Sequence, residues 1–308
     1  PATVRESTKK KVIKAMNELG FSQNTLKLPD AQSGIILIIV EALSNPFDME
    51  IATSIIDTAS TLGYNSIIVV KNNYTTHESY ENLFKNVSIA GIILHTGIVD
   101  PNFVKDLQLH YPVVMCSDYI ENMDISYVSI NDMVAAKVAT NYLISTGHTK
   151  IALVNCNPSF RYSKHREKGY KQALSEAGLD INENWIIQLS SSNYFPALSY
   201  IRQMLELPER PDAIFACSDI YGMAAINAAQ QLGIKVPEEL SVVGFDNTSM
   251  SSMTNPSLTT VAQPMAQIGA QACELLIEKI RAKNASNQQI ILDTELVIRN
   301  STCPKNIK

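Results

Sequence analysis

Two aspartates stand where successive apolar runs of the sequence end. The run 213–217 is followed by a Ser-Asp pair that ends in Asp219, and the run 240–245 is followed by Asp246. Each run has the length of a buried strand, and residues 221–232 between them show helical spacing. In open α/β sheets, ligands bind beyond the carboxyl ends of the strands, where carboxylates accept hydrogen bonds from hydroxyl or ammonium groups. The pattern predicts a β-α-β unit with a ligand site, although a helix cap at Asp219 and a turn at Asp246 explain the same residues.

The stretch around these aspartates resembles the effector domain of the LacI/GalR family of bacterial transcriptional regulators. Three motifs carry the resemblance: a strand ending in Ser-Asp before a small-residue helix, the run LGIKVPEELSVVGFD at 232–246, and the segment PSLTTVAQ at 256–263. Similar motifs extend over most of residues 1–304. The resemblance implies two Rossmann-like, doubly wound lobes of the periplasmic-binding-protein kind. It also implies a small effector in the cleft between the lobes, and a homodimer whose affinity for operator DNA the effector controls.

Residues after other apolar runs match effector positions of the same family. The segment LSNPFD at 43–48 resembles the family loop S-N-P-F-F, which brings an amide and an aromatic ring to the end of the first strand. Asp48 replaces the second aromatic ring, so a purine effector is less favoured than a sugar. The resemblance implies effector contacts at Asn45, Phe47, Asp48, His95, Asp118, Arg161, Arg166, Phe195, Asp219, Asp246 and Gln263.

Structural roles compete with some of these assignments. Asp48 also suits the first turn of a helix, where a negative charge is favourable. A lone histidine such as His95 is typically a structural hydrogen-bonding group, and the family aspartate that Asp118 matches often has a structural role. Arg166 matches a family arginine that hydrogen-bonds effector oxygens, and its five planar donors suit a polyol or a carboxylate.

The loop at 157–169 is the most polar part of the predicted lobes. It holds Arg161, Lys164, His165 and Arg166 within six positions. These charges favour an anionic effector, such as a sugar acid or a sugar phosphate. A solvated surface loop explains the same charges, so a neutral sugar stays open.

The first residues of the chain are basic, whereas the rest is acidic. Residues 1–27 hold six Lys or Arg and two Glu, which indicates a polyanion-binding element. Residues 1–24 resemble the third helix of the family's DNA-binding headpiece, and residues 25–33 occupy the place of its hinge. Because the two preceding headpiece helices are not in this sequence, operator binding is expected of a longer parent protein. The residues assigned to DNA and hinge contacts are Lys9, Lys10, Leu26 and Leu28.

Strands and helices are predicted to alternate in two successive blocks, which is typical of two doubly wound sheets. The chain is expected to cross between the lobes near 131, 262 and 290. The predicted N-terminal lobe is 34–131 plus 263–290, and the C-terminal lobe is 132–262 plus 291–308. The predicted strands are 35–40, 66–70, 89–94, 112–116, 150–155, 185–189, 213–217 and 240–245, and the tail 296–304 matches the family's closing strand. The predicted helices are 48–62, 77–86, 102–109, 133–146, 165–177, 196–206 and 219–232.

Composition narrows the class of protein. The chain has 308 residues, 45% of them hydrophobic, and no apolar run long enough to cross a membrane. Its five cysteines form no closely spaced pair, so neither a zinc site nor a disulfide is expected and the cytoplasm is the natural compartment. No nucleophile elbow, cofactor loop or zinc motif occurs, so no cofactor is expected. The first residue is Pro1 rather than Met, so the chain is expected to be part of a longer protein.

These observations favour a regulator, most simply a repressor, over two alternatives. A transport-type periplasmic sugar-binding protein shares the two-lobe fold, but the sequence shows no leader and begins with a headpiece-like helix. A doubly wound enzyme needs a nucleophile or cofactor loop that the sequence lacks.

Overall fold

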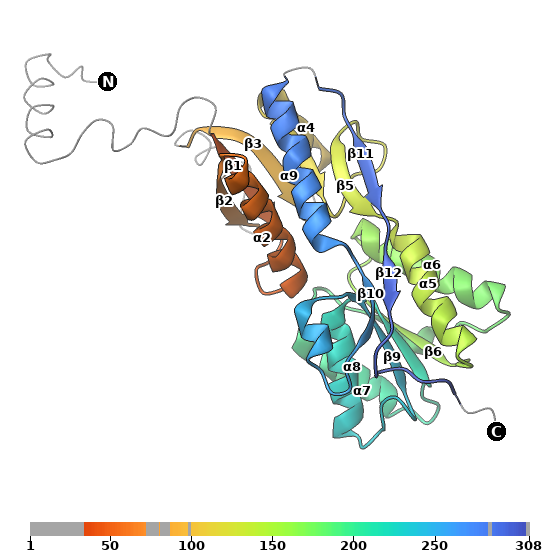
Figure 1. Ribbon diagram of the computed structural model, residues 1–308. Helices are drawn as coiled ribbons and strands as arrows, with labels where there is room; N and C mark the ends of the chain where they lie inside the picture. Colours follow the sequence, from red (N-terminus) through yellow and green to blue (C-terminus); the bar gives the residue numbers. More distant parts are fainter. Residues whose placement is uncertain (1–33, 72–79, 81–86, 98–99, 283–284, 306–308) are drawn as a thin grey trace, which may run out of the picture.

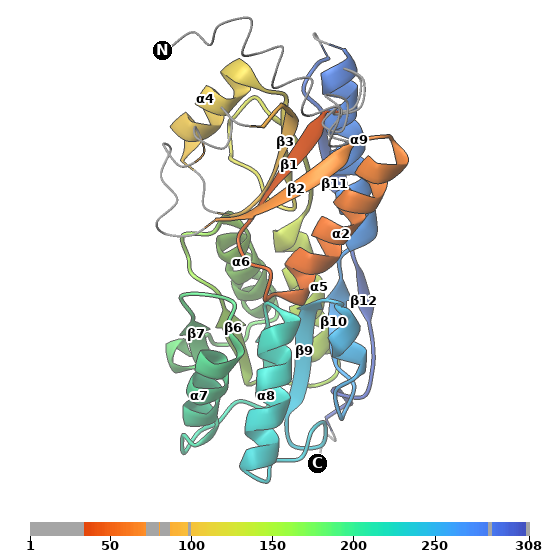
Figure 2. The same cartoon turned by 90° about the vertical axis from the view of Figure 1, so that its left-hand side faces the viewer.

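The computed structural model describes residues 34–71, 80, 87–97, 100–282 and 285–305. Within these residues the chain forms two α/β lobes, one above the other in Figure 1, each built on a six-stranded sheet. Helices cover the sheets of both lobes, as the view in Figure 2 shows. The predicted pair of doubly wound lobes is confirmed. No helix in the described part of the chain is both long and apolar enough to cross a membrane.

The N-terminal lobe has a parallel sheet in the order β11-β5-β4-β3-β1-β2. Its strands are β1 (Ile35–Val40), β2 (Asn65–Val70), β3 (Ile89–His95), β4 (Val113–Cys116), β5 (Ser126–Ile130) and β11 (Gln289–Leu292). Helices α2 (Pro46–Thr61) and α9 (Met265–Arg281) pack together on one face, and α4 (Pro101–His110) covers the other. The isoleucine-rich run of β1 and the second half of β3 are buried because both faces of the sheet are covered.

The C-terminal lobe has the sheet order β12-β10-β9-β8-β6-β7, parallel except for β12. Its strands are β6 (Ile151–Asn155), β7 (Ile186–Gln188), β8 (Ala213–Ala216), β9 (Ser241–Asp246), β10 (Thr259–Ala262) and β12 (Glu295–Val297). Helices α5 (Asp132–Ser145) and α6 (Arg161–Glu176) cover one face, and α7 (Tyr194–Leu205) and α8 (Asp219–Gln231) the other. Two short 3-10 helices, η1 (Glu183–Trp185) and η2 (Ser249–Ser252), complete it.

Three segments join the lobes. They lie between β5 and α5 at residue 131, between β10 and α9 at residues 263–264, and between β11 and β12 at residues 293–294. The third lies slightly beyond the expected position near 290. Both sheets turn the carboxyl ends of parallel strands toward the space between the lobes, where the residues after β1, β3, β4, β6, β8 and β9 line one cavity.

Several elements differ from the sequence predictions: the helix α9 and the strands β5, β10 and β11 were not predicted. The closing strand is short: β12 ends at Val297, and the tail then joins the lobe through Ser301, whose hydroxyl donates to the Val242 carbonyl at 2.6 Å. The predicted helix at 77–86 lies, Tyr80 apart, outside the described residues.

Candidate functional site

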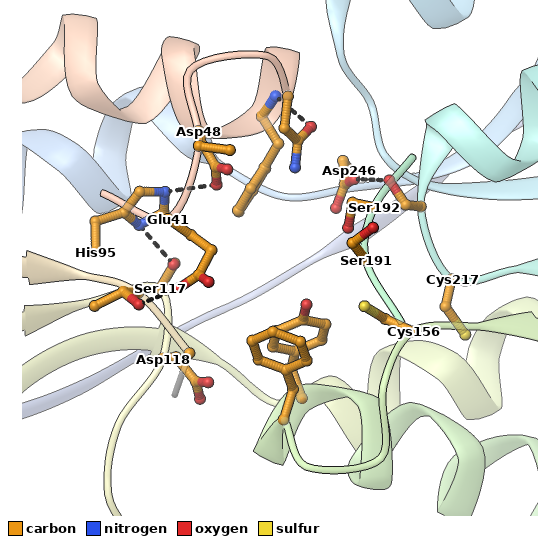
Figure 3. Close-up of a pocket in the computed structure, with 18 of the residues that line it drawn as sticks. Glu41, Asp48, His95, Ser117, Asp118, Cys156, Ser191, Ser192, Cys217 and Asp246 are labelled. Carbon is orange, nitrogen blue, oxygen red and sulfur yellow. Dashed lines mark hydrogen bonds and ion pairs between the residues drawn. The ribbon is translucent and has the colours of Figure 1, made fainter. Parts of the chain in front are cut away.

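A cavity of about 250 Å³ lies between the two lobes. Figure 3 shows its N-terminal wall, which includes Asp48 and His95, facing a C-terminal wall that includes Asp246 and two serines. Most of the residues predicted from the sequence to contact an effector do line it. They are Asn45, Phe47, Asp48, His95, Asp118, Arg166, Asp246 and Gln263.

Arg166 is fixed in the C-terminal wall by several acceptors. Its Nε donates to Asp132 Oδ1 at 2.9 Å, and its Nη1 donates to the Cys217 carbonyl at 2.6 Å. The guanidinium lies 3.7 Å from the centroid of the Phe245 ring, and only 6% of the residue is exposed. A guanidinium held in this way keeps one orientation, so it presents a fixed positive charge to the cavity.

Asp246, at the end of β9, is a second carboxyl group near Arg166, and it lines the cavity. Its Oδ1 lies 3.8 Å from Arg166 Nη1 and accepts from Gln263 Nε2 at 2.8 Å, while Oδ2 accepts from Ser218 Oγ at 2.9 Å. Burial raises the pKa of Asp246 to about 8, although the charge of Arg166 opposes the shift. Its backbone has φ +114°, which is strained for a residue other than glycine. The hydrogen bonds from Gln263 and Ser218 hold the carboxyl group in place at the cavity.

The N-terminal wall contains a chain of polar contacts from Asp48 through His95 to Ser117. His95 Nε2 lies 2.9 Å from Asp48 Oδ1, and Nδ1 lies 2.8 Å from Ser117 Oγ and 3.2 Å from the Cys116 carbonyl. Burial acts to lower the pKa of His95, but the hydrogen bonds and charge interactions with the side chains of Asp48 and Cys116 outweigh burial and raise the pKa to about 10.

The Asp48–His95–Ser117 contacts involve the same residue types as the catalytic triad of a hydrolase, but they cannot perform its chemistry. A general base must be unprotonated when the nucleophile loses its proton. His95 is an imidazolium at neutral pH, and both of its N–H groups face acceptors. The contacts therefore fix the wall of a binding cavity and do not activate Ser117 as a nucleophile.

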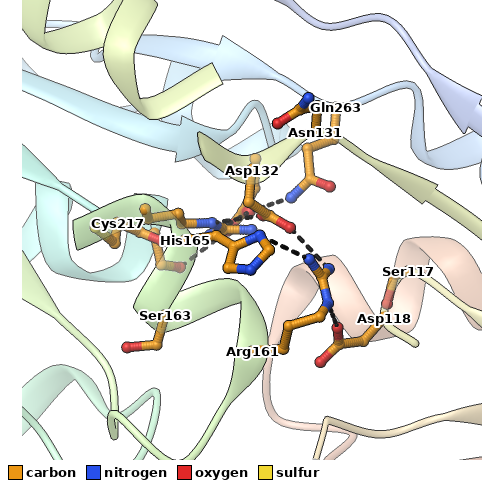
Figure 4. A network of polar contacts seen from close by, with 12 residues as sticks. Ser117, Asp118, Asn131, Asp132, Arg161, Ser163, His165, Cys217 and Gln263 are labelled. Carbon is orange, nitrogen blue, oxygen red and sulfur yellow. Dashed lines mark hydrogen bonds and ion pairs between the residues drawn. The ribbon is translucent and has the colours of Figure 1, made fainter. Parts of the chain in front are cut away.

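Arg161 joins the lobes beside the cavity (Figure 4). It belongs to α6 of the C-terminal lobe, and its Nε donates to Asp118 Oδ1 of the N-terminal lobe at 2.6 Å. Its Nη2 donates to Asp132 Oδ2 at 2.9 Å, and the guanidinium lies 3.9 Å from the centroid of the Tyr119 ring. One buried guanidinium thus holds carboxylates from both sides of the boundary between the lobes.

Comparison with known proteins agrees with this architecture. The sequence model of a periplasmic binding protein-like domain matches residues 140–302. The HTH-type transcriptional regulator DegA of Bacillus subtilis (strain 168) is 36% identical over 98% of this chain and 91% of its own length. The chain belongs to the LacI/GalR family of bacterial transcriptional regulators. The HTH-type transcriptional repressor CytR of Escherichia coli (strain K12) is 30% identical over 98% of this chain and 89% of its own.

A solved relative shows the same architecture. The transcriptional regulator CelR in its cellobiose complex superposes with a TM-score of 0.80 and 26% identity, over 97% of this chain and 92% of its own. The LacI/GalR prediction is confirmed, and the chain is a transcriptional regulator whose two-lobe core binds a small effector. The relatives named here are regulators and not enzymes.

Three of the predicted LacI/GalR effector residues do not line the cavity. Arg161 is engaged between the lobes, and Phe195 is 76% exposed on α7. Asp219 was predicted to cap a helix, but Ser218 is the N-cap of α8 and Asp219 is its first residue, so the cap prediction is wrong. The oxygens of Asp219 accept from Thr260 Oγ1 at 2.6 Å and from the Thr248 amide at 2.7 Å. Asp219 therefore ties α8 to the loop that follows Asp246.

Most of the basic side chains in the loop at 157–169 also lie outside the cavity lining. Lys164 is exposed, and His165 Nε2 lies 3.0 Å from Glu121 Oε1, outside the cavity lining. Of the four basic residues in this loop, Arg166 alone lines the cavity. Arg166 is thus the one residue of this loop whose charge still favours an anionic effector in the cavity. The DNA and hinge candidates Lys9, Lys10, Leu26 and Leu28 lie outside the described residues.

The sequence analysis missed several polar residues of the cavity, namely three serines and a glutamate. Ser190, Ser191 and Ser192 follow β7, and Glu41 follows β1 directly. Their position after a strand was the signal that would have found them, because the same rule identified Asp246. The aromatic wall of Phe160, Tyr162 and Tyr221 has no such signal, since two of these residues lie at or just inside the start of α6 and the third within α8.

Proposed function

We propose that the cavity binds an effector of the sugar class, with several hydroxyl groups and either no charge or an amine. Serine hydroxyls, carboxyl groups and the amides of Asn45 and Gln263 line it, together with the rings of Phe47, Phe160 and Tyr162. Alternating hydrogen-bonding groups and aromatic faces suit a sugar, which has polar edges and apolar faces. The structure of the relative CelR as a cellobiose complex supports the same class.

Regulation follows from the position of the cavity. Both lobes contribute to its walls, so a ligand that contacts both favours one relative orientation of the lobes. In a homodimer acting in the cytoplasm, that orientation sets the spacing of two DNA-binding headpieces and so the affinity for an operator. We propose that the parent protein acts as a repressor in this way, with effector binding and operator binding coupled.

Thermal unfolding in the presence of neutral sugars, sugar acids and sugar phosphates tests the effector class. A ligand at a hundredfold over its Kd stabilises the folded protein by about 2.7 kcal/mol. We expect a shift with at least one neutral or amine-bearing sugar and none with the acids. Arg166→Ala and Asp246→Ala should remove the shift, because both side chains line the cavity.

Arg202→Ala and Asp180→Ala are the matched controls. Both residues are exposed and outside the cavity lining, so these variants should respond to the ligand as the wild type does. A shift with a sugar acid or sugar phosphate alone would contradict the assigned class. A shift that survives both cavity substitutions would place the ligand elsewhere.

A further inference from the structure

Asp118 has one carboxyl oxygen in use and one without a partner. Oδ1 accepts from Arg161 Nε at 2.6 Å and from the Tyr119 amide at 2.9 Å. Oδ2 is buried and has no hydrogen-bond partner among the described residues. The residue lines the cavity and is only 4% exposed. A buried acceptor in this condition keeps the full cost of desolvation, so a donor that reaches it gains more than a donor at the surface does.

The surroundings of Oδ2 form a small cradle. A Cβ on Gly97 would stand 3.2 Å from Oδ2 and 2.5 Å from Phe160 Cδ1, so the glycine leaves room where a side chain would collide. Gly97 belongs to the N-terminal lobe and Phe160 to the C-terminal lobe, and both line the cavity. Residues of both lobes therefore surround this oxygen.

Carboxylates outnumber cations in the N-terminal wall. Glu41, Asp48 and Asp118 line it, whereas His95, its buried cation, is already bound to Asp48. Glu41 accepts from Thr96 Oγ1 and lies 3.7 Å from Lys71 Nζ at the edge of the cavity. Arg161 divides its charge between Asp118 and Asp132.

The charge of Asp118 is therefore only partly compensated. Burial raises the pKa of Asp118 to about 6, although the charge of Arg161 opposes the shift. At neutral pH Asp118 is therefore mostly ionised, and its Oδ2 is a buried carboxylate oxygen without a hydrogen-bond partner among the described residues.

We propose that the effector carries a protonated amine on the side that faces the N-terminal lobe, and that Asp118 Oδ2 accepts its hydrogen bond. This inference rests on the proposed function, since it names the donor that a sugar-class effector brings to the cavity. A hydroxyl group would satisfy the hydrogen bond alone, whereas an ammonium group also neutralises the excess charge of this wall. Hydrogen bonds between charged partners are roughly twice as strong as neutral ones.

The same contact connects the effector to the boundary between the lobes. Asp118 Oδ1 accepts from Arg161, as Figure 4 shows. If Oδ2 accepts from the amine, the two cations share one carboxylate. The amine weakens the attraction between Asp118 and Arg161, because the negative charge is divided between them. Asp118 is thus a specificity-determining residue. Binding of an amine to it directly changes its interaction with Arg161 of α6.

Matched sugars test the inference by calorimetric titration at a pH where the amines are protonated. The pairs are glucosamine with glucose, galactosamine with galactose, and mannosamine with mannose, and the N-acetyl form of each amino sugar controls for size without charge. We expect at least one amino sugar to bind about tenfold more tightly than both of its neutral counterparts. Asp118→Asn should reduce that preference to about onefold, because its amide keeps an acceptor for Arg161 but carries no charge.

Asp57→Asn is the control variant, since Asp57 is exposed on α2 and outside this cavity, and it should retain the preference. Asp118→Ser is a second neutral variant for the case in which Asp118→Asn does not fold. Neutral sugars that bind as tightly as the amino sugars would overturn the inference and leave the proposed function intact. Binding of no sugar at all would overturn both. A preference for amines that persists in the neutral variants of Asp118 would show that another group provides it, and would also overturn the inference.

Discussion

The protonation state of His95 determines which hydrogen bonds hold the N-terminal wall of the cavity together. As an imidazolium it donates from both ring nitrogens and holds Asp48 of α2 against the ends of β3 and β4. As a neutral ring it would keep one donor, and one of these contacts would be lost. The geometry of the cavity therefore depends on a proton that this histidine retains well above its ordinary pKa.

Stability should depend on pH through this residue. The pKa of folded-state His95 is raised to about 10, above its ordinary value of 6.5. Its stabilisation is therefore fully present below about pH 6.5 and is lost as the pH rises toward 10. The free energy of unfolding of wild type minus that of His95→Gln should fall over this range, by at most about 1.4 kcal/mol for each pH unit.

Urea denaturation at several pH values between 6.5 and 10 measures this difference. His110→Gln provides the control, because His110 is exposed on α4, and its difference from wild type should stay constant. A constant difference for His95→Gln as well would mean that His95 is neutral in the folded protein.

At the residue scale, the sequence predicted which residues line the cavity better than it predicted their hydrogen-bond partners. The rule that ligands lie beyond the ends of strands placed Asp48, His95 and Asp246 correctly at the cavity. The same rule applied to Asp219, whose oxygens are occupied by Thr248 and Thr260 from other elements. No local pattern encodes those partners, because they come within reach only when β9 and β10 pair.

At the scale of elements, the backbones of α5 and α6 come into close contact at Gly169. A Cβ on Gly169 of α6 would stand 2.2 Å from the Met133 carbonyl oxygen and 3.0 Å from Ala136 Cβ on α5. Backbone atoms cannot yield as a side chain does, so this crossing requires glycine. The crossing matters to the site because α6 carries Arg161 and Arg166, while α5 begins with Asp132.

Gly169→Ala should therefore destabilise the protein by about 2 kcal/mol or more through overpacking. Gly222→Ala is the matched comparison, because its added methyl group meets the end of a side chain, the terminal methyl groups of Leu258 at 2.7 and 3.1 Å, and not a backbone atom at such short distance. Urea denaturation should show a clearly smaller loss for Gly222→Ala. Equal losses would mean that α5 and α6 separate at little cost.

Most of the long, strongly patterned elements were predicted, although the 17-residue helix α9 was missed, and short polar elements were not predicted. The apolar runs of β1, β3 and β9 and the periodic helices α5, α7 and α8 lie close to the predicted ranges. Strand β5, with the sequence SYVSI, was missed because serines occupy two of its five buried positions. Its Ser126 and Ser129 hydroxyls donate to Asn287 and to the Ser117 carbonyl, contacts that a single sequence does not reveal.

At the scale of the whole molecule, the orientation of the lobes depends on Arg161. Removing its guanidinium leaves the carboxylates of Asp118 and Asp132 without the cation they share. Breaking a buried ion pair on one side costs on the order of 3 kcal/mol. Arg161→Ala should therefore lower the free energy of unfolding by about that amount and let the lobes of the ligand-free protein separate.

Small-angle X-ray scattering measures the separation as a larger radius of gyration without ligand. Arg202→Ala, which removes an exposed arginine of α7, should leave the radius of gyration unchanged. An unchanged radius in Arg161→Ala would show that the three connecting segments fix the lobes without help from this side chain.

The three crossings also set the order in which the lobes can be completed during synthesis. The N-terminal lobe needs α9 to cover Ile51 and Ile55 of α2, and it needs β11 to pair with β5. Both elements leave the ribosome after the whole of α5 to β10 has emerged. The lobe that is translated first can therefore cover α2 and complete its sheet only after most of its neighbour has been synthesised, while β12 of the C-terminal lobe emerges later still. A chaperone that shields α2 until residue 292 appears would act on the growing polypeptide.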